Sequence, residues 1–368
     1  MRTKAAVLHD FNTPLAIDEV ELQEPKANEV SVKMVSSGVC HSDLHLVQGH
    51  IPVNLPIICG HEGAGIVTAV GPGPSTVQVG DRVVLSWVSP CGNCNYCATG
   101  NPALCVTAIG PSYEGQLHDG TSRFSDLEGT TISHHLMLST FSQEVTVPAS
   151  AAIRVPEDVP LAPLAVIGCA VSTGIGAVVN TGNVQLGDSV AVIGCGGVGL
   201  NALQGARLRG AGKIIGVDVN EEKLEAARRF GATHTVNAAE EDTAEALIAM
   251  TGGMGVDLAV EAIGHPQTVA TAVRSLRRGG TAVQVGIAPY GTEVSIDMTL
   301  LLDERKLLGC YYGSLRPAFD IPRYVDLYRA GKLLVEELIT AEIEQDEING
   351  ALNQFERGEG IRSLVRYS

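Results

Sequence analysis

The sequence predicts an α/β protein in which a doubly wound parallel sheet is joined to a second domain rich in β-strands. Short apolar strand patterns alternate with helical patterns from residue 189 onward, and the first of these strands runs into a glycine-rich turn. The first 170 residues instead carry strand and turn patterns. A chain of 368 residues is long enough for two such domains.

The strands expected in the first part are short apolar or alternating runs. Gly71-Pro72-Gly73-Pro74 and Gly80-Asp81 separate them as turns. The runs cover residues 4–8, 30–35, 66–70 and 82–87.

The second half is organised around residues 189–218. A β-branched run at 189–193 leads into a turn containing four glycines, then a helical run at 200–209, then a second strand that ends at Asp218. This order is typical of a dinucleotide-binding βαβ unit, although a glycine-rich structural turn remains an alternative. Gly194 allows a tight turn, Gly196 lets the backbone approach a pyrophosphate, and Gly199 lets the helix pack closely. Asp218 can accept both ribose hydroxyls, which favours NAD over NADP.

Four further strands and the helices between them complete the predicted Rossmann sheet. Asn220 caps a helix over 221–230 that Gly231 ends, and another helix begins at Pro266 and is followed by Gly279-Gly280. A tail helix over 321–330 and a last strand over 363–367 should return to the first domain. We therefore expect domains at 1–170 with 314–368, and at 171–313. The four strands cover residues 233–236, 256–260, 281–285 and 306–311.

Composition excludes several kinds of partner. A net charge of −16 would repel nucleic acid and anionic membranes. The most apolar stretch, 161–171, is too short to span a bilayer and contains Pro163, and the N-terminus lacks a signal-peptide core. We expect a soluble, cytoplasmic protein that acts on a small molecule. In a reducing compartment, its nine cysteines indicate metal binding rather than a disulfide scaffold.

One group of cysteines is closely spaced, in the pattern C-x2-C-x2-C-x7-C, with glycine and proline to bend the loop. Four thiolates can hold one tetrahedral Zn²⁺ without an open position, so the predicted site is structural. An iron–sulfur cluster and free thiols are the alternatives. The four residues are Cys91, Cys94, Cys97 and Cys105.

Other metal-binding residue types are dispersed along the chain. They lie in Cys40-His41-Ser42-Asp43-Leu44-His45, in Gly60-His61-Glu62 and at Cys169 within 168–174. Together with the four-cysteine group, the segments 119–124 and 139–143 and the glycine turn, they resemble the zinc-containing medium-chain alcohol dehydrogenases. The resemblance covers nearly the whole chain and is strongest to the dimeric branch, which includes thiol-dependent formaldehyde dehydrogenases. It implies that the first domain is a GroES-like catalytic domain.

The resemblance implies a catalytic zinc held by Cys40, His61 and Cys169. Three protein ligands leave a position for substrate or water. Glu62 would lie beside the metal and approach it transiently, and Asp43 would hold the His61 ring through its other nitrogen.

The resemblance also assigns Ser42 and His45 to a proton relay that removes the alcohol proton, with the cofactor ribose between them. A helix cap for Ser42 and an ordinary exposed histidine for His45 are the alternatives.

Cofactor contacts follow from the same likeness. Thr173 would lie near the nicotinamide, Lys223 near the adenosine ribose, and His41 and Arg362 at the pyrophosphate; surface roles for Lys223 and Arg362 stay open. The family more often has arginine at the position of His41, so we expect faster NADH release, which His41→Arg should slow. The remaining cofactor assignments are Gly197, Val198, Val285 and Ile287.

Trp87, at the end of a predicted strand, matches a position that lines the family's substrate pocket. A bulky ring there should favour primary over branched secondary alcohols. Core packing is the alternative for this residue.

The predicted protein is therefore a homodimeric, NAD- and zinc-dependent oxidoreductase of primary alcohols and aldehydes. Three alternatives remain: a formaldehyde dehydrogenase acting on a glutathione or mycothiol adduct, a nicotinoprotein that retains NAD(H), and a non-catalytic NAD(H)-binding sensor or structural protein. The last should lack zinc ligands, which this chain has.

Overall fold

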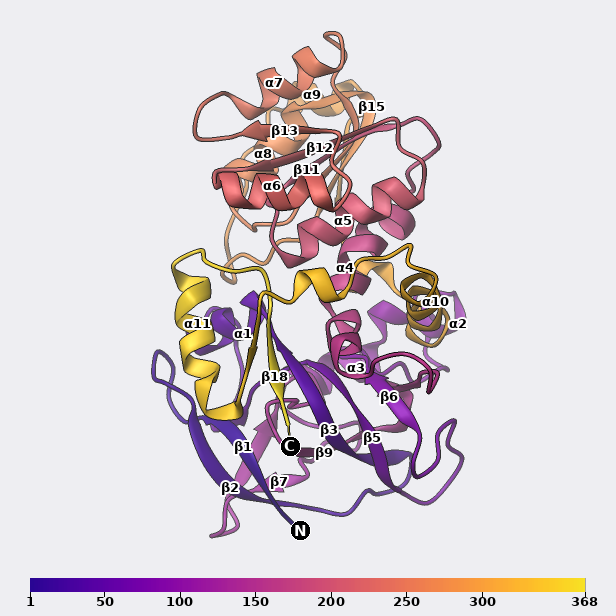
Figure 1. Ribbon diagram of the computed structural model, residues 1–368, viewed down its shortest axis with the longest axis vertical. Coiled ribbons are helices and arrows are strands. Elements are labelled where there is room, and N and C mark those ends of the chain that lie inside the picture. The colour runs from indigo at the N-terminus through magenta and orange to yellow at the C-terminus, as the bar shows by residue number, and fades with distance from the viewer. Residues whose placement is uncertain (368) are drawn as a thin grey trace. The chain divides into compact units, whose positions relative to one another are not determined.

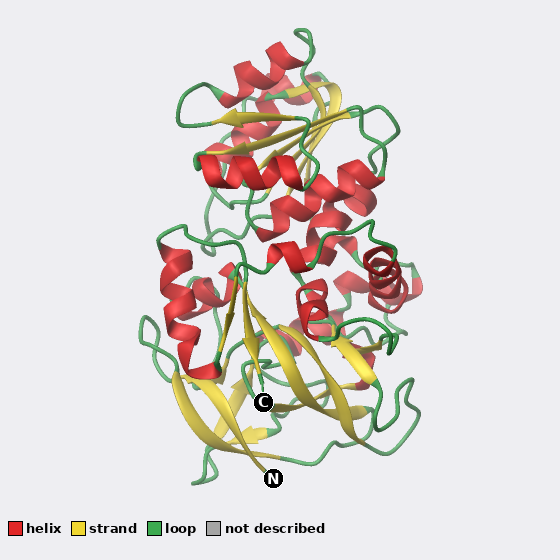
Figure 2. Cartoon of the chain, viewed as in Figure 1, coloured by secondary structure: helices red, strands yellow, loops and turns green. Residues whose placement is uncertain are grey.

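The computed structural model describes residues 1–367 and divides into two compact units. One comprises residues 1–169 and 316–368, and the other comprises residues 170–315. Figure 2 shows how their secondary structure differs: strands dominate the first unit, whereas strands and helices alternate in the second.

The unit of residues 170–315 contains a six-stranded sheet in which all neighbouring strands are parallel. The order β13-β12-β11-β14-β15-β16 places β11 between β12 and β14, so the direction of strand addition reverses there. All six predicted strands are present, and the doubly wound fold is confirmed. The strands are β11 (Ser189–Ile193), β12 (Lys213–Asp218), β13 (His234–Asn237), β14 (Val256–Glu261), β15 (Leu276–Gln284) and β16 (Lys306–Gly309).

Helices cover both faces of this sheet. Figure 1 shows α5 and α6 on one side and α7 on the other. The Asn220 side chain accepts hydrogen bonds from the backbone N–H groups of Glu222 and Lys223, as the N-cap of α6. The helices of this unit are α4 (Ala170–Gly176), α5 (Gly197–Leu208), α6 (Glu221–Arg229), α7 (Thr243–Met250), α8 (Pro266–Arg274) and α9 (Met298–Leu302).

One boundary differs from the sequence prediction. Gly279 and Gly280 lie inside β15 instead of ending a helix before it. The pairing of β14 with β15 shifts in register between Val256 and Leu258, opposite this irregular segment. Two adjacent glycines in a strand are typical of such an irregularity, a use that the helix-stop pattern does not distinguish.

The other unit is built on a closed barrel and a seven-stranded sheet. The barrel order is β1-β2-β7-β8-β4, and β3 lies within the sheet between β5 and β18, with β9 also paired to it. Because β18 comes from the C-terminal tail, the tail returns to this unit. The strands are β1 (Arg2–Leu8), β2 (Ala16–Leu22), β3 (Glu29–Val39), β4 (Ile57–Ile58), β5 (Glu62–Val70), β6 (Arg82–Leu85), β7 (Phe124–Ser125), β8 (Thr131–His134), β9 (Glu144–Pro148), β10 (Ala152–Arg154), β17 (Ala341–Ile343) and β18 (Ser363–Arg366).

Short helices connect these strands, and α1 packs against α11 and a shared apolar cluster that includes Leu46, Phe141 and Leu352. A turn of 3-10 helix, Ala162–Gly168, is entirely buried. Within residues 1–367 no single helix is long and apolar enough to cross a membrane; one bent pair, Ala162–Gly168 with Ala170–Thr181, meets the length and composition criteria together. The α-helices are α1 (His41–Val47), α2 (Asn95–Ala98), α3 (Val106–Tyr113), α10 (Pro317–Arg329) and α11 (Ile348–Glu356).

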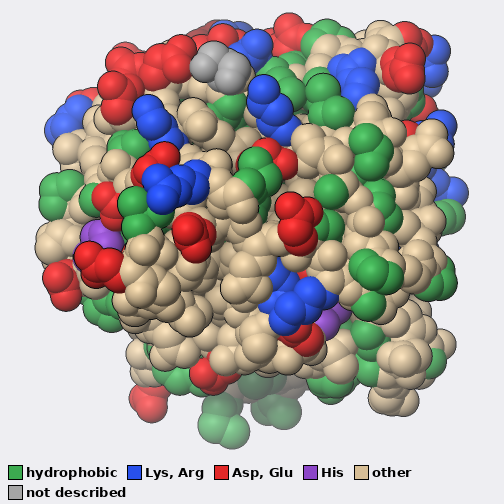
Figure 3. Space-filling model, turned by 90° about the horizontal axis from the view of Figure 1, so that it is seen from below, with side chains coloured by type: hydrophobic (Ala, Val, Ile, Leu, Met, Phe, Trp, Pro, Cys, Tyr) green, Lys and Arg blue, Asp and Glu red, His purple; other side chains and the backbone are tan. Residues whose placement is uncertain are grey.

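Charged side chains of both signs lie on the surface of the molecule. Figure 3 shows one face of the molecule, on which acidic and basic side chains are interspersed. Acidic residues outnumber basic ones by 41 to 25 in the whole chain. An excess of negative charge favours solubility and opposes non-specific binding to polyanions.

Candidate functional site

Four predicted metal-site residues converge in the unit of residues 1–169 and 316–368. Cys40 lies between β3 and α1, His61 directly precedes β5, Glu62 begins that strand, and Cys169 follows the buried 3-10 helix. Their candidate ligand atoms all lie within 4.8 Å of one another, and all four residues are buried. Segments far apart in sequence thus supply one compact set of donors.

Asp43 connects three parts of this cluster. Its carboxylate accepts hydrogen bonds from the backbone N–H groups of Cys40 (2.9 Å) and Gly60 (3.2 Å), and lies 3.0 Å from Nδ1 of His61. Burial alone would raise the pKa of Asp43, but His61 and His135 lower it to about 2. An ionised Asp43 accepts the Nδ1 proton of His61 and so leaves Nε2 to bind a metal.

His135 is a member of this cluster that the sequence analysis missed. Its Nδ1 lies 3.5 Å from the Oδ1 atom of Asp43, and its ring centroid lies 5.2 Å from that of His61. The side chain is only 3% exposed. No spacing in the sequence links residue 135 to residues 43 and 61, so only the fold could reveal the contact.

The buried thiols of Cys40 and Cys169 are hydrogen-bonded to each other. The hydrogen bond from Cys169 is the largest influence on Cys40 and holds its pKa well below the usual value, against burial and with help from Arg362 and His61. The same bond, together with burial, raises the pKa of Cys169. Zinc would bind both sulfurs as thiolates, with release of any proton they carry. Two buried thiols and one oriented imidazole therefore fit a catalytic zinc with an open position.

A buried ion pair lies beside the two thiols. Nη1 of Arg362 donates to the carbonyl of Val39 (2.9 Å) and lies 3.6 Å from Oε1 of Glu62. Burial raises the pKa of Glu62 to about 7, although Arg362 opposes the shift. The carboxylate has room because residue 38 is glycine: a Cβ there would lie 2.0 Å from Oε2 of Glu62. Sequence reasoning did not detect the role of Gly38.

The predicted relay residues lie on α1, next to Cys40. The Oγ atom of Ser42 is 3.6 Å from Sγ of Cys40. His45 is one turn further along, half-buried, with its ring 5.2 Å from that of His41. His41 itself is exposed, and its ring stacks on Phe355 at 6.1 Å.

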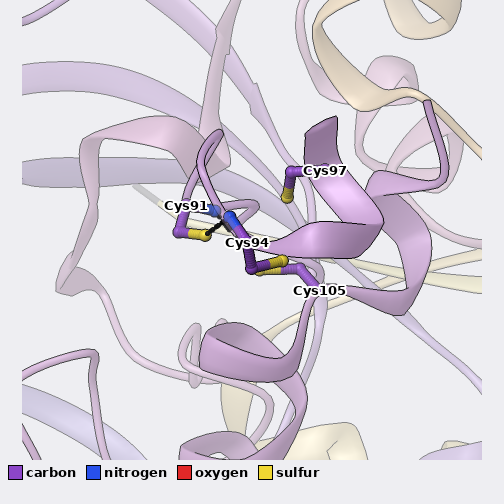
Figure 4. Close-up of side chains that lie close together, drawn as sticks. All are labelled: Cys91, Cys94, Cys97 and Cys105. Atoms are coloured by element: carbon purple, nitrogen blue, oxygen red, sulfur yellow. Dashed lines mark hydrogen bonds between the residues drawn. The ribbon is translucent and has the colours of Figure 1, made fainter. Parts of the chain in front are cut away.

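The four-cysteine group forms a second cluster, shown in Figure 4. Its four sulfur atoms lie within 4.8 Å of one another, and Cys105 is the only fully buried member. Backbone N–H groups point at the sulfurs: Cys94 N donates to Sγ of Cys91, and Cys91 N donates to Sγ of Cys105, both at 3.3 Å. Such bonds stabilise thiolates. The donor set fits a closed, tetrahedral zinc site.

The glycine turn has the shape that a dinucleotide requires. A Cβ at residue 199 would lie 1.8 Å from the carbonyl oxygen of Gly194, so the helix can pack this closely only with glycine. A Cβ at residue 196 would meet nothing within 4 Å, which leaves an open cradle at the start of α5. The first N–H groups of a helix attract phosphate oxygens. The turn therefore fits the pyrophosphate of NAD.

Asp218 ends β12 beside this turn. Its Oδ2 accepts from the N–H of Cys195 (2.8 Å), and its Oδ1 accepts from the N–H groups of Val219 and Asn220. The half-exposed carboxylate is thus fixed in position while each oxygen keeps acceptor capacity for a ribose hydroxyl.

The other predicted cofactor residues occupy varied positions. Thr173, in α4, is 9% exposed, and its Oγ1 has no hydrogen-bond partner in the described chain. The Nε atom of buried Arg362 is likewise unpartnered within residues 1–367. Buried orphan donors of this kind indicate a missing ligand. The remaining positions lie at helix starts or just after β15, and all but Gly197 are at least partly exposed. They are Gly197, Val198, Lys223, Val285 and Ile287.

Trp87 lies two residues beyond the end of β6, so the strand is shorter than predicted. Its ring is half-buried and packs against the apolar cluster that includes Val83 and Leu85. Core packing therefore accounts for part of the ring.

These observations define a class: a two-unit oxidoreductase with a dinucleotide-binding sheet and two thiol-based zinc sites. Comparisons with known proteins agree. The zinc-binding dehydrogenase family matches residues 197–329, and the alcohol dehydrogenase GroES-like domain matches residues 26–157.

Relatives align over the full chain. S-(hydroxymethyl)glutathione dehydrogenase of Paracoccus denitrificans is 40% identical over 375 aligned positions, covering 100% of both chains. Alcohol dehydrogenase class-3 of Cereibacter sphaeroides is also 40% identical, covering 99% of this chain and 100% of the relative. Among solved structures, benzyl alcohol dehydrogenase from Acinetobacter calcoaceticus superposes with a TM-score of 0.93 at 34% identity, with 100% of each chain covered.

The chain belongs to the zinc-containing medium-chain alcohol dehydrogenases. It is an NAD-dependent zinc enzyme that transfers hydride between an alcohol or aldehyde and the nicotinamide cofactor. The predicted family, fold and cofactors are confirmed.

Proposed function

We propose that the chain oxidises primary alcohols, and reduces the matching aldehydes, at a zinc held by Cys40, His61 and Cys169. The convergence of these three buried side chains carries the proposal. When bound, zinc supplies a Lewis acid that acidifies the alcohol, and NAD accepts the hydride. The unit of residues 1–169 and 316–368 is then the catalytic domain, and residues 170–315 bind NAD.

Other residues of the buried cluster then have defined roles. Asp43 orients His61 and keeps its proton on Nδ1. Ser42, whose Oγ lies 3.6 Å from Sγ of Cys40, accepts the alcohol proton as it gives up its own hydroxyl proton, and His45 carries a proton onward from the site. Glu62, paired with Arg362, stays near the metal as an alternative ligand during exchange.

Cofactor contacts are assigned to the glycine turn, to Asp218 and to the other predicted cofactor residues. Gly194, Gly196 and Gly199 shape the pyrophosphate cradle, and Asp218 selects the unphosphorylated ribose. The unpartnered atoms of Thr173 and Arg362 support contacts to the nicotinamide and the pyrophosphate. The remaining contacts are assigned to His41, Gly197, Val198, Lys223, Val285 and Ile287.

The four-cysteine zinc would be structural. Cys91, Cys94, Cys97 and Cys105 use every position of a tetrahedral ion and leave none for substrate. Their role is to hold a loop-rich lobe that contains only short helices.

A substrate series tests the main proposal. The enzyme, NAD⁺ and a panel of primary, secondary and aromatic alcohols should give NADH formation with primary alcohols preferred, because Trp87 narrows the pocket. A preference for branched secondary alcohols would contradict the proposed role of Trp87. No turnover of any alcohol or aldehyde by zinc-loaded protein would contradict the function.

A thiol adduct is the second candidate substrate. S-(hydroxymethyl)glutathione dehydrogenases are among the relatives at 40% identity. Formaldehyde should be assayed alone, with glutathione and with mycothiol. Turnover that requires one thiol, and exceeds that of simple alcohols, would replace the primary-alcohol proposal. Stoichiometric NAD(H) on the purified protein would instead indicate a nicotinoprotein.

We also propose a homodimer formed by edge-to-edge pairing of the cofactor sheets. The strand β16 ends the sheet, and the neighbouring helix α9 exposes Met298 (80%) and Leu302 (85%). Exposed apolar side chains beside a sheet edge are typical of an interface. Light scattering should give twice the chain mass, and Leu302→Asp should produce monomers.

We further propose that the protein is located in the reducing cytoplasm. All nine cysteines are free, and the two proposed zinc sites require thiolates.

A further inference from the structure

The turn at the end of α1 places another histidine, His50, next to His45 of the proposed relay. Gly49 has a φ of 74°, and its N–H donates to the carbonyl of Leu46 (3.0 Å), while the N–H of His50 donates to that of His45 (2.9 Å). This is the Schellman arrangement, which places the residue after the glycine beside the residue five positions earlier. The chain reversal therefore aligns His50 with His45.

The two rings meet through matching nitrogens. Nδ1 of His45 lies 3.0 Å from Nδ1 of His50, and the ring centroids are 5.3 Å apart. One of the two nitrogens must carry the shared hydrogen, because two lone pairs would repel at this distance. With its Nδ1 engaged, His45 has only Nε2 available to receive a proton from the active site.

The surroundings of His45 disfavour storage of a proton there. Burial is the main influence, and His41 and His50 add to it, so the pKa of His45 falls to about 4, although Cys40 raises it. Nearby on α11, Phe355 stacks on His41, and Glu356 is hydrogen-bonded to Gln48. A proton that reaches His45 at neutral pH must therefore move on quickly.

We propose that His50 accepts the proton from His45 and releases it to water, as the outer member of the relay. The proposal rests on the role of His45 in the proposed function. His50 is half-exposed, so water can reach its ring.

Each proton can be followed through the pair. A proton binds Nε2 of His45, and the Nδ1–H bond of His45 breaks as its proton moves to Nδ1 of His50. The His50 imidazolium then loses its Nε2 proton to water. One proton has crossed the pair, and the His45–His50 hydrogen bond has reversed its direction. In aldehyde reduction the same steps run backward. Between oxidation cycles both rings turn over, so that the Nε2–H of His45 donates to the bare Nε2 of His50 and the bare Nδ1 of His45 can accept the next proton.

The experiment follows proton release directly. Enzyme saturated with NAD⁺ is mixed with the alcohol that the substrate series shows to react fastest, in weak buffer containing a pH-indicator dye. The rate of proton release is measured for the wild type, His50→Ala, His50→Gln and His45→Gln. We expect both His50 variants to release protons about tenfold more slowly, a modest general-base effect because water partly replaces the ring. Added imidazole should restore His50→Ala with saturation.

The matched control is His9→Ala, which removes an exposed histidine that pairs with Asp18. It should release protons at the wild-type rate, and each variant's zinc content and unfolding temperature establish that it is folded. Wild-type proton release by His50→Ala with slow release by His45→Gln would overturn the role of His50 alone. Wild-type release by His45→Gln would overturn both relay roles, while alcohol oxidation would still support the proposed function. Slow release without imidazole rescue would also overturn the role of His50, as a structural effect.

Discussion

The two cysteine-rich clusters of this chain differ in how they are encoded and in how far they are from water. The four-cysteine cluster comes from residues 91–105 and is mostly half-exposed. The cluster of Cys40, His61, Glu62 and Cys169 comes from three distant segments and is fully buried.

The contrast follows from what each ion does. A structural zinc needs only a closed tetrahedron, which a short loop can supply. A catalytic zinc needs an open position in a dry, preorganised site, and only tertiary packing can exclude water from all sides. Substitutions that remove one zinc site and leave the other intact test this division of roles.

Removal of Cys169 should have the largest effect. Cys169→Ala removes one of three proposed zinc ligands and leaves Cys40 without the hydrogen bond that lowers its pKa. We expect kcat/KM to fall by about 10⁴-fold or more, since the Lewis acid is lost. Metal analysis should show one zinc per chain instead of two. Cys59→Ala, which alters a buried thiol outside both clusters, should keep both ions; its loss of zinc would contradict the assignment.

Removal of Cys97 should affect stability more than chemistry. Cys97→Ala opens the four-cysteine site, so the lobe loses its ion. We expect the unfolding temperature to fall by about 5–10 °C, with kcat changed only a few-fold in freshly prepared protein. Calorimetry and metal analysis measure both effects. A complete loss of activity with an unchanged unfolding temperature would assign the catalytic ion to this cluster instead.

Loss of the Asp43 charge should weaken the buried site without emptying it. Asp43→Asn keeps the shape but removes the ionised partner of His61. We expect zinc affinity at this site to fall about 10- to 100-fold, measured by competition with a chelator. Asp18→Asn is the matched control, because Asp18 contacts His9 in an exposed Asp–His pair. Equal effects of the two substitutions would refute the role of Asp43.

The smallest expected effect is a change in the pH dependence of stability caused by the buried His134. His134 is fully buried, and burial, with a contribution from Arg123, lowers its pKa to about 3 from 6.5. The unfolded chain therefore binds more protons between these values, so the stability contributed by neutral His134 is complete above pH 6.5 and declines toward pH 3. The decline should be about 2 kcal/mol between pH 7 and pH 5. In urea unfolding of His134→Gln, the free energy of unfolding should depend less steeply on pH than in the wild type. An unchanged pH dependence would contradict the lowered pKa of His134.

The sequence predicted most of the fold because its signals were local. The six parallel strands and the Asn220 cap follow from strand patterns, glycines and capping residues that lie next to one another. The four-cysteine cluster is predictable for the same reason. Gly279 and Gly280 were misassigned because two glycines end a helix or disturb a strand equally well.

The buried cluster could be predicted only in part. Its Cys40, His61 and Cys169 were identified through resemblance, since no spacing joins them. His135, Gly38 and His50 were missed because their importance depends on contacts across the fold or around a helix end: Asp43 for His135, Glu62 for Gly38 and His45 for His50.

Anomalous diffraction at the zinc absorption edge, from crystals of the NAD-bound enzyme, tests the central assignment most directly. We predict two peaks per chain, one within about 2.3 Å of the sulfurs of Cys40 and Cys169 and beside Nε2 of His61, and one among the four clustered cysteines. A single peak at the four-cysteine cluster, or a buried peak without both Cys40 and Cys169 as ligands, would contradict the account.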